Sequence, residues 1–374
     1  MTDEPRVRIM HVIASLSGYG AEHFVAGLLP LLAAAGAEVG ALTLYPPKSA
    51  QSNGDLNGVP VFCAGRRRRV QIDFFPRMVR AILSFQPTIV HTHMHNGKYW
   101  GRLAAAAARV PCIVHTEHDS NLHRLAIERV ADALLLPVTT RFIAFSEDQR
   151  ERLARADRIP LSRIVVIPNG IVHRPVEPHT RERGRALLGI APFQRAVMMI
   201  GRLEAPKNHE LALRAFASLP ARLSATTKLC LVGDGSRGEE LRAMSEALGI
   251  ANRVSFFGFR SDAADLLAGA DVMLMTSRAE AMPIAIIEAM GVGTPIVSTP
   301  WFGVDALLES GRLGYIAADF EPETVALTLA EALRDPEGAL FKGQAARRRA
   351  LARYDLNEAV RRHLDLYRSL LKST

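Results

Sequence analysis

Two carboxylates, Glu280 and Glu288, lie in one stretch of the chain where their surroundings favour contact with a ligand. The apolar run at 271–275 predicts a buried strand, and Pro283 has the fixed φ that suits the start of the following helix. Glu280 therefore lies in a strand-to-helix loop, and Glu288 is the only charge of the apolar helix at 284–290. Such loops commonly bind phosphates, and an unpaired buried carboxylate costs free energy. The alternative is a structural glutamate in a core helix.

Two cations and two glycines follow other predicted strand ends. Arg202 and Lys207 come after the first strand of the second half, where helix dipoles favour anions, so the pair suits a diphosphate. Either cation alone would by default be a solvent-exposed charge. Gly18 and Gly20 follow the first strand of the chain and would let the backbone approach a diphosphate, although a plain tight turn explains them equally well.

A Gly-x-Gly-x-x-Gly motif occurs at 233–238, between a predicted strand and a predicted helix, so a nicotinamide-dependent enzyme is an alternative. The next predicted strand, 253–257, runs into Gly258-Phe-Arg260 without the acidic residue expected on a ribose. We therefore do not expect a dinucleotide oxidoreductase.

Histidines are concentrated in the first half of the chain. His91, His93 and His95 alternate at the end of a predicted strand and should point to one face, and His115 and His118 end the next strand. The clustering makes a zinc site conceivable. No Cys-x-x-Cys pair or His-Glu-x-x-His helix accompanies them, so we predict no metal. Core or surface histidines are the alternative.

The elements that position these residues alternate between strand-like and helix-like segments over 374 residues, of which 48% are hydrophobic and 22% charged. Such alternation predicts mostly parallel sheets covered by helices on both faces. We predict an N-terminal Rossmann-like domain at 1–170, a polar linker at 171–192, a second Rossmann-like domain at 193–350 and a C-terminal helix at 351–374. That helix could pack back on the N-terminal domain.

The net charge of +8 predicts an anionic partner such as a nucleotide, a nucleic acid or a lipid headgroup. The longest apolar run is too short to span a bilayer, and three unpaired cysteines without a visible secretory signal favour a cytoplasmic protein. A basic run is followed by paired aromatics, and by default it is a solvated loop. It could also contact an anionic membrane surface through Arg66, Arg67, Arg68, Arg69, Phe74 and Phe75.

The segment from Glu280 to Glu288, followed by Ala289-Met-Gly-Val-Gly-Thr-Pro-Ile-Val297, resembles the Glu-x7-Glu signature of retaining nucleotide-sugar glycosyltransferases of family four. Gly201-Arg-Leu-Glu-Ala-Pro-Lys-Asn208 and Val114-His-Thr-Glu-His-Asp119 are similar to two further family segments. The resemblance implies the GT-B fold, in which two facing Rossmann-like doubly wound domains enclose a deep interdomain cleft. Ala281 stands where the family commonly has glycine, and the segment 301–306 also departs from the family pattern.

The family resemblance also implies roles for individual residues. His118 and Glu280 would be catalytic, with Glu280 on the hydroxyls of the transferred sugar. The donor would bind to Gly18, Gly20, Arg202, Lys207, Arg260, Ala281, Met282, Ile284 and Glu288, with the two cations on the diphosphate, Glu288 on the ribose and the backbone around Arg260 near the base. Pro283 has no N–H, so the amide donors would be those of its neighbours.

The implied activity is transfer of a sugar from a nucleoside diphosphate sugar to a glycan, lipid-linked or small-molecule acceptor, with retention of configuration, in polysaccharide or glycolipid biosynthesis. We expect no cofactor, no obligatory metal and no nucleic-acid partner. Two alternatives stay open, a nucleotide-sugar epimerase on the same fold and a non-catalytic protein that binds sugar nucleotides.

Overall fold

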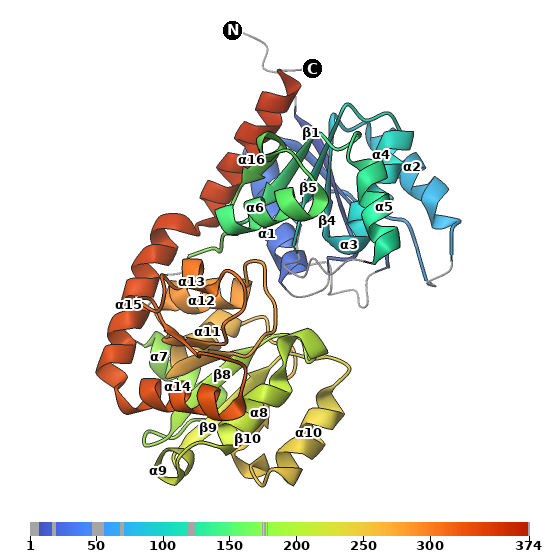
Figure 1. Ribbon diagram of the computed structural model, residues 1–374. Helices are drawn as coiled ribbons and strands as arrows, with labels where there is room; N and C mark the ends of the chain where they lie inside the picture. Colours follow the sequence, from blue (N-terminus) through green and yellow to red (C-terminus); the bar gives the residue numbers. More distant parts are fainter. Residues whose placement is uncertain are drawn as a thin grey trace. The chain divides into compact units, whose positions relative to one another are not determined.

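The computed structural model describes residues 7–16, 20–46, 56–67, 71–118, 125–173, 175, 177 and 179–372. Two compact units make up the chain (Figure 1). The first runs to Gly170 and also takes the segment from Leu356 onward, and the second is Ile171–Asp355.

The first unit is built on a parallel sheet of seven strands in the order β3-β2-β1-β4-β5-β6-β7. The strands are β1 (Arg8–Ile13), β2 (Glu38–Thr43), β3 (Val61–Cys63), β4 (Ile89–His93), β5 (Cys112–Thr116), β6 (Arg141–Ala144) and β7 (Ile164–Val166). Its helical segments are α1 (Ala21–Ala34), α2 (Phe74–Phe85), α3 (Met94–Asn96), the π-helical η1 (Gly97–Gly101), α4 (Arg102–Ala107), α5 (Ala126–Leu135), α6 (Glu147–Asp157), η2 (Leu161–Arg163) and α16 (Leu356–Leu371).

The two faces of the first sheet carry different side chains because successive residues of a strand point to opposite faces. Met10 and Val12 of β1 belong to an apolar core on one face. The opposite face carries His11, whose ring lies 6.5 Å from that of Tyr367 in α16. The helix α16 also packs on α1, so the end of the chain completes the first unit (Figure 1).

The second unit contains a six-stranded parallel sheet in the order β10-β9-β8-β11-β12-β13. The strands are β8 (Arg195–Ile200), β9 (Thr227–Val232), β10 (Val254–Phe256), β11 (Val272–Met275), β12 (Ile296–Ser298) and β13 (Tyr315–Ile316). The helical segments are α7 (Thr180–Leu188), η3 (Ala205–Lys207), α8 (His209–Ala217), α9 (Ala221–Ser224), α10 (Gly238–Ala247), η4 (Ala251–Arg253), α11 (Ala263–Gly269), α12 (Ile284–Val292), α13 (Val304–Leu307), α14 (Pro322–Arg334) and α15 (Pro336–Arg353).

Apolar cores cover both faces of this second sheet. Along β8, Val197 and Met199 belong to one core while Ala196 and Met198 belong to the other. A strand that is buried on both faces consists of consecutive apolar residues, which is why the sequence predicted a strand at this position. The strand order reverses between β8 and β11, and ligands of open α/β sheets bind at the carboxyl ends of strands at such a point.

The segment at 171–192 differs from the linker that we predicted, because it belongs to the second unit and contains α7. This helix packs closely on α11. A Cβ atom on Gly184 would lie 2.3 Å from the carbonyl oxygen of Asp265, and one on Gly269 would lie 2.3 Å from the backbone of Gly184. We predicted a linker because the segment is polar and rich in proline. The structure instead has a helix there, because Gly184 and Gly269 let the backbones of α7 and α11 approach each other.

Candidate functional site

The loops that follow β8 and β11 are joined at the carboxyl edge of the second sheet. The Thr276 hydroxyl donates to the carbonyl oxygen of Asn208 over 2.9 Å, and the Arg278 amide donates to that of Pro206 over 3.0 Å. Asn208 adopts a positive φ of 54°, which turns the chain from η3 into α8. These contacts fix the backbone on both sides of Lys207.

Lys207 and Glu280 form an ion pair within this junction. The Lys207 ammonium donates to Glu280 Oε1 over 2.5 Å, and the two side chains are 24% and 11% exposed. Lys207, which we predicted to bind the donor, and Glu280, which we predicted to be catalytic, are 73 positions apart in sequence and are in contact. Arg202, in the same loop as Lys207, is exposed to solvent.

The helix α12 begins immediately after this loop. Pro283 precedes its first residue, Ile284, and Ala281 and Met282 lie just before them in the loop. The first amide groups of a helix have no partner within the helix and point out of its N-terminus. Glu288 lies one turn into α12 and is half-buried. Its contact with a ribose stays a prediction.

Arg260 makes a local pair with Asp262. Its guanidinium donates to both carboxylate oxygens, Nε over 2.7 Å and Nη2 over 2.5 Å. The pair lowers the pKa of the Asp262 carboxyl, chiefly through the hydrogen bond from Arg260. Asp262 thus holds the side chain of Arg260. Our prediction concerned only the backbone around Arg260, which we expect near the base.

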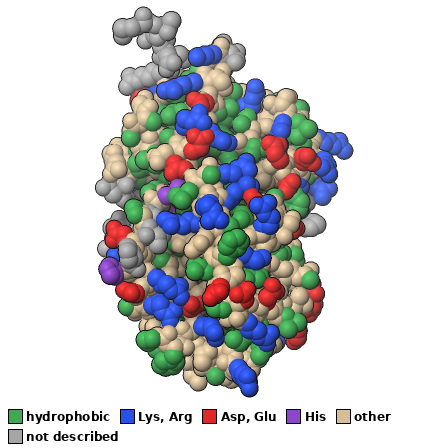
Figure 2. Space-filling view, turned by 90° about the vertical axis from the view of Figure 1, so that its left-hand side faces the viewer, with side chains coloured by type: hydrophobic (Ala, Val, Ile, Leu, Met, Phe, Trp, Pro, Cys, Tyr) green, Lys and Arg blue, Asp and Glu red, His purple; other side chains and the backbone are tan. Residues whose placement is uncertain are grey.

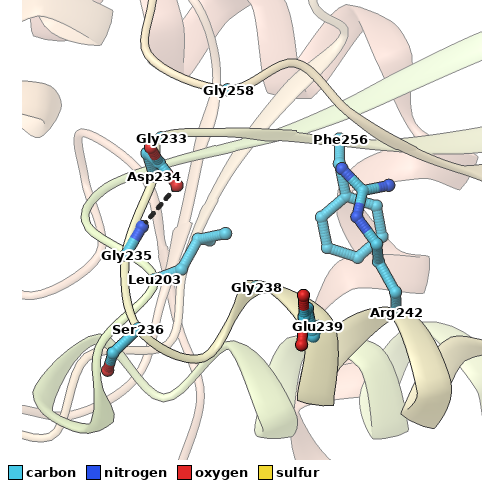
Figure 3. Close-up of a pocket in the computed structure, with 10 residues that line it drawn as sticks. All are labelled: Leu203, Gly233, Asp234, Gly235, Ser236, Gly238, Glu239, Arg242, Phe256 and Gly258. Carbon is cyan, nitrogen blue, oxygen red and sulfur yellow. Dashed lines mark hydrogen bonds between the residues drawn. The ribbon is translucent and has the colours of Figure 1, made fainter.

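The glycines at 233–238 serve close backbone packing. A Cβ atom on Gly233 would lie 1.9 Å from the Gly201 carbonyl oxygen, and one on Gly235 would lie 2.6 Å from the Leu203 carbonyl oxygen. A hollow of about 360 Å³ lies beside this turn, and Figure 3 shows Arg242 against the ring of Phe256 on its wall, 4.3 Å from the ring centroid. The Gly-x-Gly-x-x-Gly motif, which had suggested a nicotinamide-dependent enzyme, is therefore explained by close contact between the loops that follow β8 and β9.

Of the two first-unit glycines predicted for the donor, Gly20 lies at the start of α1. Gly20 caps this helix with a positive φ of 57°, a conformation that glycine adopts without strain. Gly18 lies outside the described residues.

His11, His91, His93 and His118 form a cluster at the carboxyl ends of β1, β4 and β5, whereas the buried His115 lies beside Thr92 on the other face of the sheet. His11 Nδ1 lies 2.9 Å from His93 Nε2, and His93 Nδ1 lies 3.1 Å from His118 Nε2. His91 is bound separately, by the Tyr367 hydroxyl at 2.6 Å and by the Thr116 hydroxyl at 2.7 Å.

The cluster corrects our prediction for His95. Met94 has a positive φ of 59° and ends β4, so His95 turns away to solvent and lies 3.5 Å from Glu128. Sequence reasoning also missed His11 and His363, which come from the first strand and the last helix. The only available signal was His11 inside an apolar strand, because its pairing with His91 depends on the sheet order.

Three of these histidines, His11, His91 and His93, could hold a metal ion, since one ring nitrogen from each lies within 4.8 Å of the others. Their nitrogens already bind one another, Tyr367 or Thr116. Of the ring nitrogens of these three histidines, only Nε2 of His11 lacks a partner among the described residues. A metal would have to replace these hydrogen bonds, so the arrangement fits a hydrogen-bonded core better than a tetrahedral site.

We expect the protein to lose stability as pH falls below about 6.5. Burial lowers the pKa of His11 to about 3 and those of His115 and His363 to about 4, so the unfolded chain takes up protons that the folded chain rejects. Each such histidine contributes about 1.4 kcal/mol per pH unit between its unfolded and folded pKa. Urea unfolding at pH 7.5 and 5.0 tests this, and equal midpoints would contradict it. Replacement of the exposed His179 serves as the control substitution.

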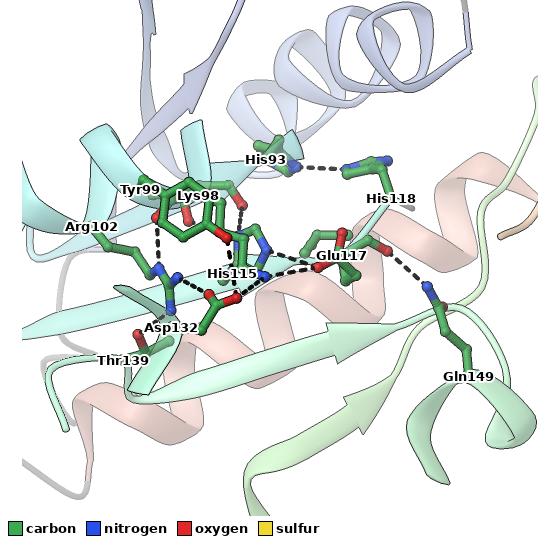
Figure 4. A network of polar contacts seen from close by, with 12 residues as sticks. His93, Lys98, Tyr99, Arg102, His115, Glu117, His118, Asp132, Thr139 and Gln149 are labelled. Atoms are coloured by element: carbon green, nitrogen blue, oxygen red, sulfur yellow. Dashed lines mark hydrogen bonds and ion pairs between the residues drawn. The ribbon is translucent and has the colours of Figure 1, made fainter. Parts of the chain in front are cut away.

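Beside the histidines lies a second buried group of polar side chains that the sequence did not reveal (Figure 4). Lys98 Nζ lies 3.2 Å from Glu117 and 3.0 Å from Asp132, and Arg102 Nη2 donates to Asp132 over 2.8 Å. Glu117 directly precedes His118 in the chain, and Gln149 donates to its carbonyl oxygen over 3.0 Å. Opposite charges thus fix the backbone from which His118 projects.

The predicted membrane contact is wrong for Phe74 and Arg66, because both side chains are buried. Phe74 is fully buried and packs edge-on against Trp100, with ring centroids 5.0 Å apart. Arg66 is also buried, with its guanidinium 5.0 Å from the Phe74 ring, and Phe75 is partly buried. Periodicity in the sequence could not reveal this, because the aromatic pair begins α2 and faces the core.

The basic residues do not gather over one element on the face drawn in Figure 2, where Lys and Arg are scattered among acidic and hydrophobic side chains. Arg67 is exposed, whereas Arg68 and Arg69 lie outside the described residues. Within the described ranges, no helix combines the length and apolar character needed to cross a bilayer.

Two protein families match successive parts of the chain and together cover most of its length. The family described as Glycosyl transferases group 1 matches residues 181–349, and Glycosyltransferase Family 4 matches residues 19–174. The chain belongs to the family-four glycosyltransferases. This confirms the resemblance carried by the segments around Glu280 and Lys207.

Among curated relatives, a D-inositol 3-phosphate glycosyltransferase of Mycobacterium marinum is 27% identical over 287 residues, which cover 71% of this chain and 60% of that protein. An Escherichia coli UDP-Gal:alpha-D-GlcNAc-diphosphoundecaprenol alpha-1,3-galactosyltransferase is 28% identical over 238 residues, with 61% and 62% covered. The chain therefore spans about three fifths of the length of these relatives.

Solved structures confirm the GT-B fold. The structure of Anabaena Alr3699/HepE in complex with UDP and glucose matches with a TM-score of 0.84 at 21% identity, covering 97% of this chain and 100% of that one. A sucrose-phosphate synthase from Thermosynechococcus elongatus matches with a TM-score of 0.83 at 20% identity, covering 99% and 100%.

Proposed function

We propose that this protein is a retaining glycosyltransferase that moves a sugar from a nucleoside diphosphate sugar to a glycan, lipid-linked or small-molecule acceptor. The observation that carries the proposal is the ion pair between Lys207 and Glu280. It lies where the strand order of the second sheet reverses, between β8 and β11. It sets a cation and a carboxylate side by side, the two groups that a departing diphosphate and a sugar hydroxyl require.

In the proposed reaction, the bond between the sugar and the diphosphate breaks while negative charge grows on the diphosphate. Lys207 and Arg202 stabilise that charge, together with the amides at the start of α12. Glu280 accepts hydrogen bonds from the transferred sugar, Glu288 binds the ribose, and His118 contacts the sugar or its acceptor. These cations supply the positive charge, so we propose that no metal is obligatory.

Retention of configuration rests on the family resemblance and is proposed with it. So is a role in polysaccharide or glycolipid biosynthesis, which agrees with a curated relative named for a diphosphoundecaprenol-linked acceptor. Proton NMR of the first-formed product reports the anomeric configuration directly, and an inverted product would contradict retention.

A thermal-shift panel of nucleoside diphosphates and their sugars tests the function first, because a ligand that binds the folded state raises Tm. The donors that bind are then incubated with and without candidate acceptors. Conversion of donor alone would indicate the epimerase, and binding without any turnover would indicate a non-catalytic protein.

We expect Glu288→Ala to raise KM for the donor and Glu280→Ala to lower kcat. Glu288 is assigned to the ribose, which is bound equally before and during reaction, whereas Glu280 is assigned to the sugar that changes. Steady-state kinetics with varied donor separate the two effects. The conservative variants Glu280→Gln and Glu288→Gln serve as shape-matched controls, and wild-type kinetics in both alanine variants would refute the assignment.

Peripheral contact of a cytoplasmic protein with anionic membrane stays a prediction, now restricted to Arg67, Arg68 and Arg69. Each basic residue near anionic lipid contributes about 1 kcal/mol, so binding should be reversible and should weaken as salt rises. Co-sedimentation with anionic and neutral vesicles compares the wild type with a variant carrying serine at these three positions. Arg66 is left intact because it packs in the core. Equal pelleting of the two proteins would reject the contact.

A further inference from the structure

Three histidines of the first unit form an unbroken chain of hydrogen bonds. It runs from His11 through His93 to His118, with nitrogen to nitrogen distances of 2.9 Å and 3.1 Å, and Figure 4 shows its last link. His11 and His93 are fully buried and their rings stack with centroids 5.1 Å apart, whereas His118 is partly exposed. The chain thus leads from the core to a residue that a ligand can reach.

All three imidazoles are neutral at physiological pH. Burial lowers the pKa of His11 and of His118 to about 3, and it lowers that of His93 well below its usual value. A neutral imidazole carries one N–H and one bare nitrogen. The central His93 can therefore donate one of its two hydrogen bonds and must accept the other. Both bonds of the chain consequently run in the same direction, either from His11 to His118 or from His118 to His11.

The buried end of the chain decides which direction this is. Nε2 of His11 has no partner among the described residues. If the bonds ran from His118 inward, this nitrogen would carry a buried N–H without an acceptor. If they run outward, it is a bare acceptor, and orphaned buried N–H groups are the rarer defect in folded proteins. The outward direction leaves no donor unsatisfied at that end.

We propose that His11 and His93 are positioning residues that hold His118 as the tautomer with its proton on Nδ1. In this arrangement His11 Nδ1 donates to His93 Nε2, and His93 Nδ1 donates to His118 Nε2. His118 then offers its Nδ1–H as a hydrogen-bond donor to an oxygen of the bound sugar. The tautomer follows from the chain alone, whereas the sugar as acceptor of this bond rests on the proposed function.

The neighbouring side chains do not compete for the same nitrogens. His91 is bound to Tyr367 and Thr116, and His115 lies 3.0 Å from the Thr92 hydroxyl. The His118 ring packs edge-on against Phe145 with centroids 5.1 Å apart. Among the described residues, the hydrogen bond from His93 and the ring contact with Phe145 orient it.

The tautomer can be measured without any substrate. Long-range ¹H–¹⁵N correlation spectra of protein labelled in the histidine rings distinguish a protonated Nδ1 from a protonated Nε2. We expect Nδ1–H for His118 in the wild type. We expect a change to the Nε2–H form, which free histidine prefers, in His93→Leu. In His93→Asn, the side-chain amide replaces the lost donor and Nδ1–H should be kept. The exposed His95→Ala is the matched control and should leave His118 unchanged.

An Nε2–H form of His118 in the wild type would overturn the proposal, even if His93→Leu fails to fold. An unchanged tautomer in a folded His93→Leu protein would also overturn it, as would one equivalent of zinc held by these rings. For activity, we expect kcat to fall roughly 2- to 10-fold in His93→Leu, the value of one hydrogen bond, and to recover in His93→Asn. If the wild type shows the Nδ1–H form but transfers no sugar, the chain stands and the proposed function fails.

Discussion

Replacing Lys207 with alanine is expected to lower kcat/KM by about 2–4 kcal/mol of transition-state stabilisation, or roughly 30- to 1000-fold. The Lys207 ammonium is held 2.5 Å from Glu280 by loops that are hydrogen-bonded to each other. A charge fixed before the reaction needs no reorganisation when the diphosphate departs, which is why its loss costs so much. Removing it also leaves the carboxylate of Glu280, only 11% exposed, without this partner.

Steady-state kinetics of Lys207→Ala measure this effect, with Lys228→Ala as the control because Lys228 lies in β9 away from the loop. Arg202→Ala should show a loss in the same range. The double variant Lys207→Ala/Glu280→Ala should lose less than the sum of the single losses, because the two side chains contact each other. Rates within about twofold of wild type in Lys207→Ala would mean that this cation has no role in the reaction.

The second large effect is on stability, where Asp132→Asn is expected to lower the free energy of unfolding by roughly 3–5 kcal/mol. The Asp132 carboxylate binds Arg102 at 2.8 Å, Lys98 at 3.0 Å and the Tyr99 hydroxyl at 3.2 Å, and the residue is 8% exposed. Asparagine keeps the shape but removes the charge. Lys98 then keeps its ion pair with Glu117, whereas the buried Arg102 loses its ion pair with Asp132. An uncompensated buried charge is costly.

Urea unfolding followed by circular dichroism measures the change. The matched control is Asp365→Asn, since Asp365 pairs with Arg361 at 3.0 Å on the surface of α16, where both side chains are more than half exposed. We expect that control to change stability little because surface ion pairs are screened by water. Equal unfolding midpoints for Asp132→Asn and wild type would show that the buried network does not stabilise the first unit.

The sequence by itself was sufficient for the two parallel sheets and for the neighbourhood of Lys207 and Glu280. Strands buried on both faces appear as short apolar runs, such as 271–275, and each run can be identified locally. The carboxyl ends of parallel strands meet at one edge of a sheet. Lys207 and Glu280 each follow a strand, the family resemblance gave them their roles at the donor, and the structure places them in contact.

Only the tertiary structure decided which buried polar groups meet. His11 and His93 are 82 positions apart, and their contact depends on β1 lying beside β4 in the sheet. The pairing of Lys98 with Asp132, and the burial of Phe74 beneath Arg66, likewise depend on how helices lie on that sheet. Local periodicity reports whether a side chain is buried, but strand order and register determine its neighbours. The hydrogen-bond chain from His11 through His93 to His118 could therefore not be predicted from the sequence.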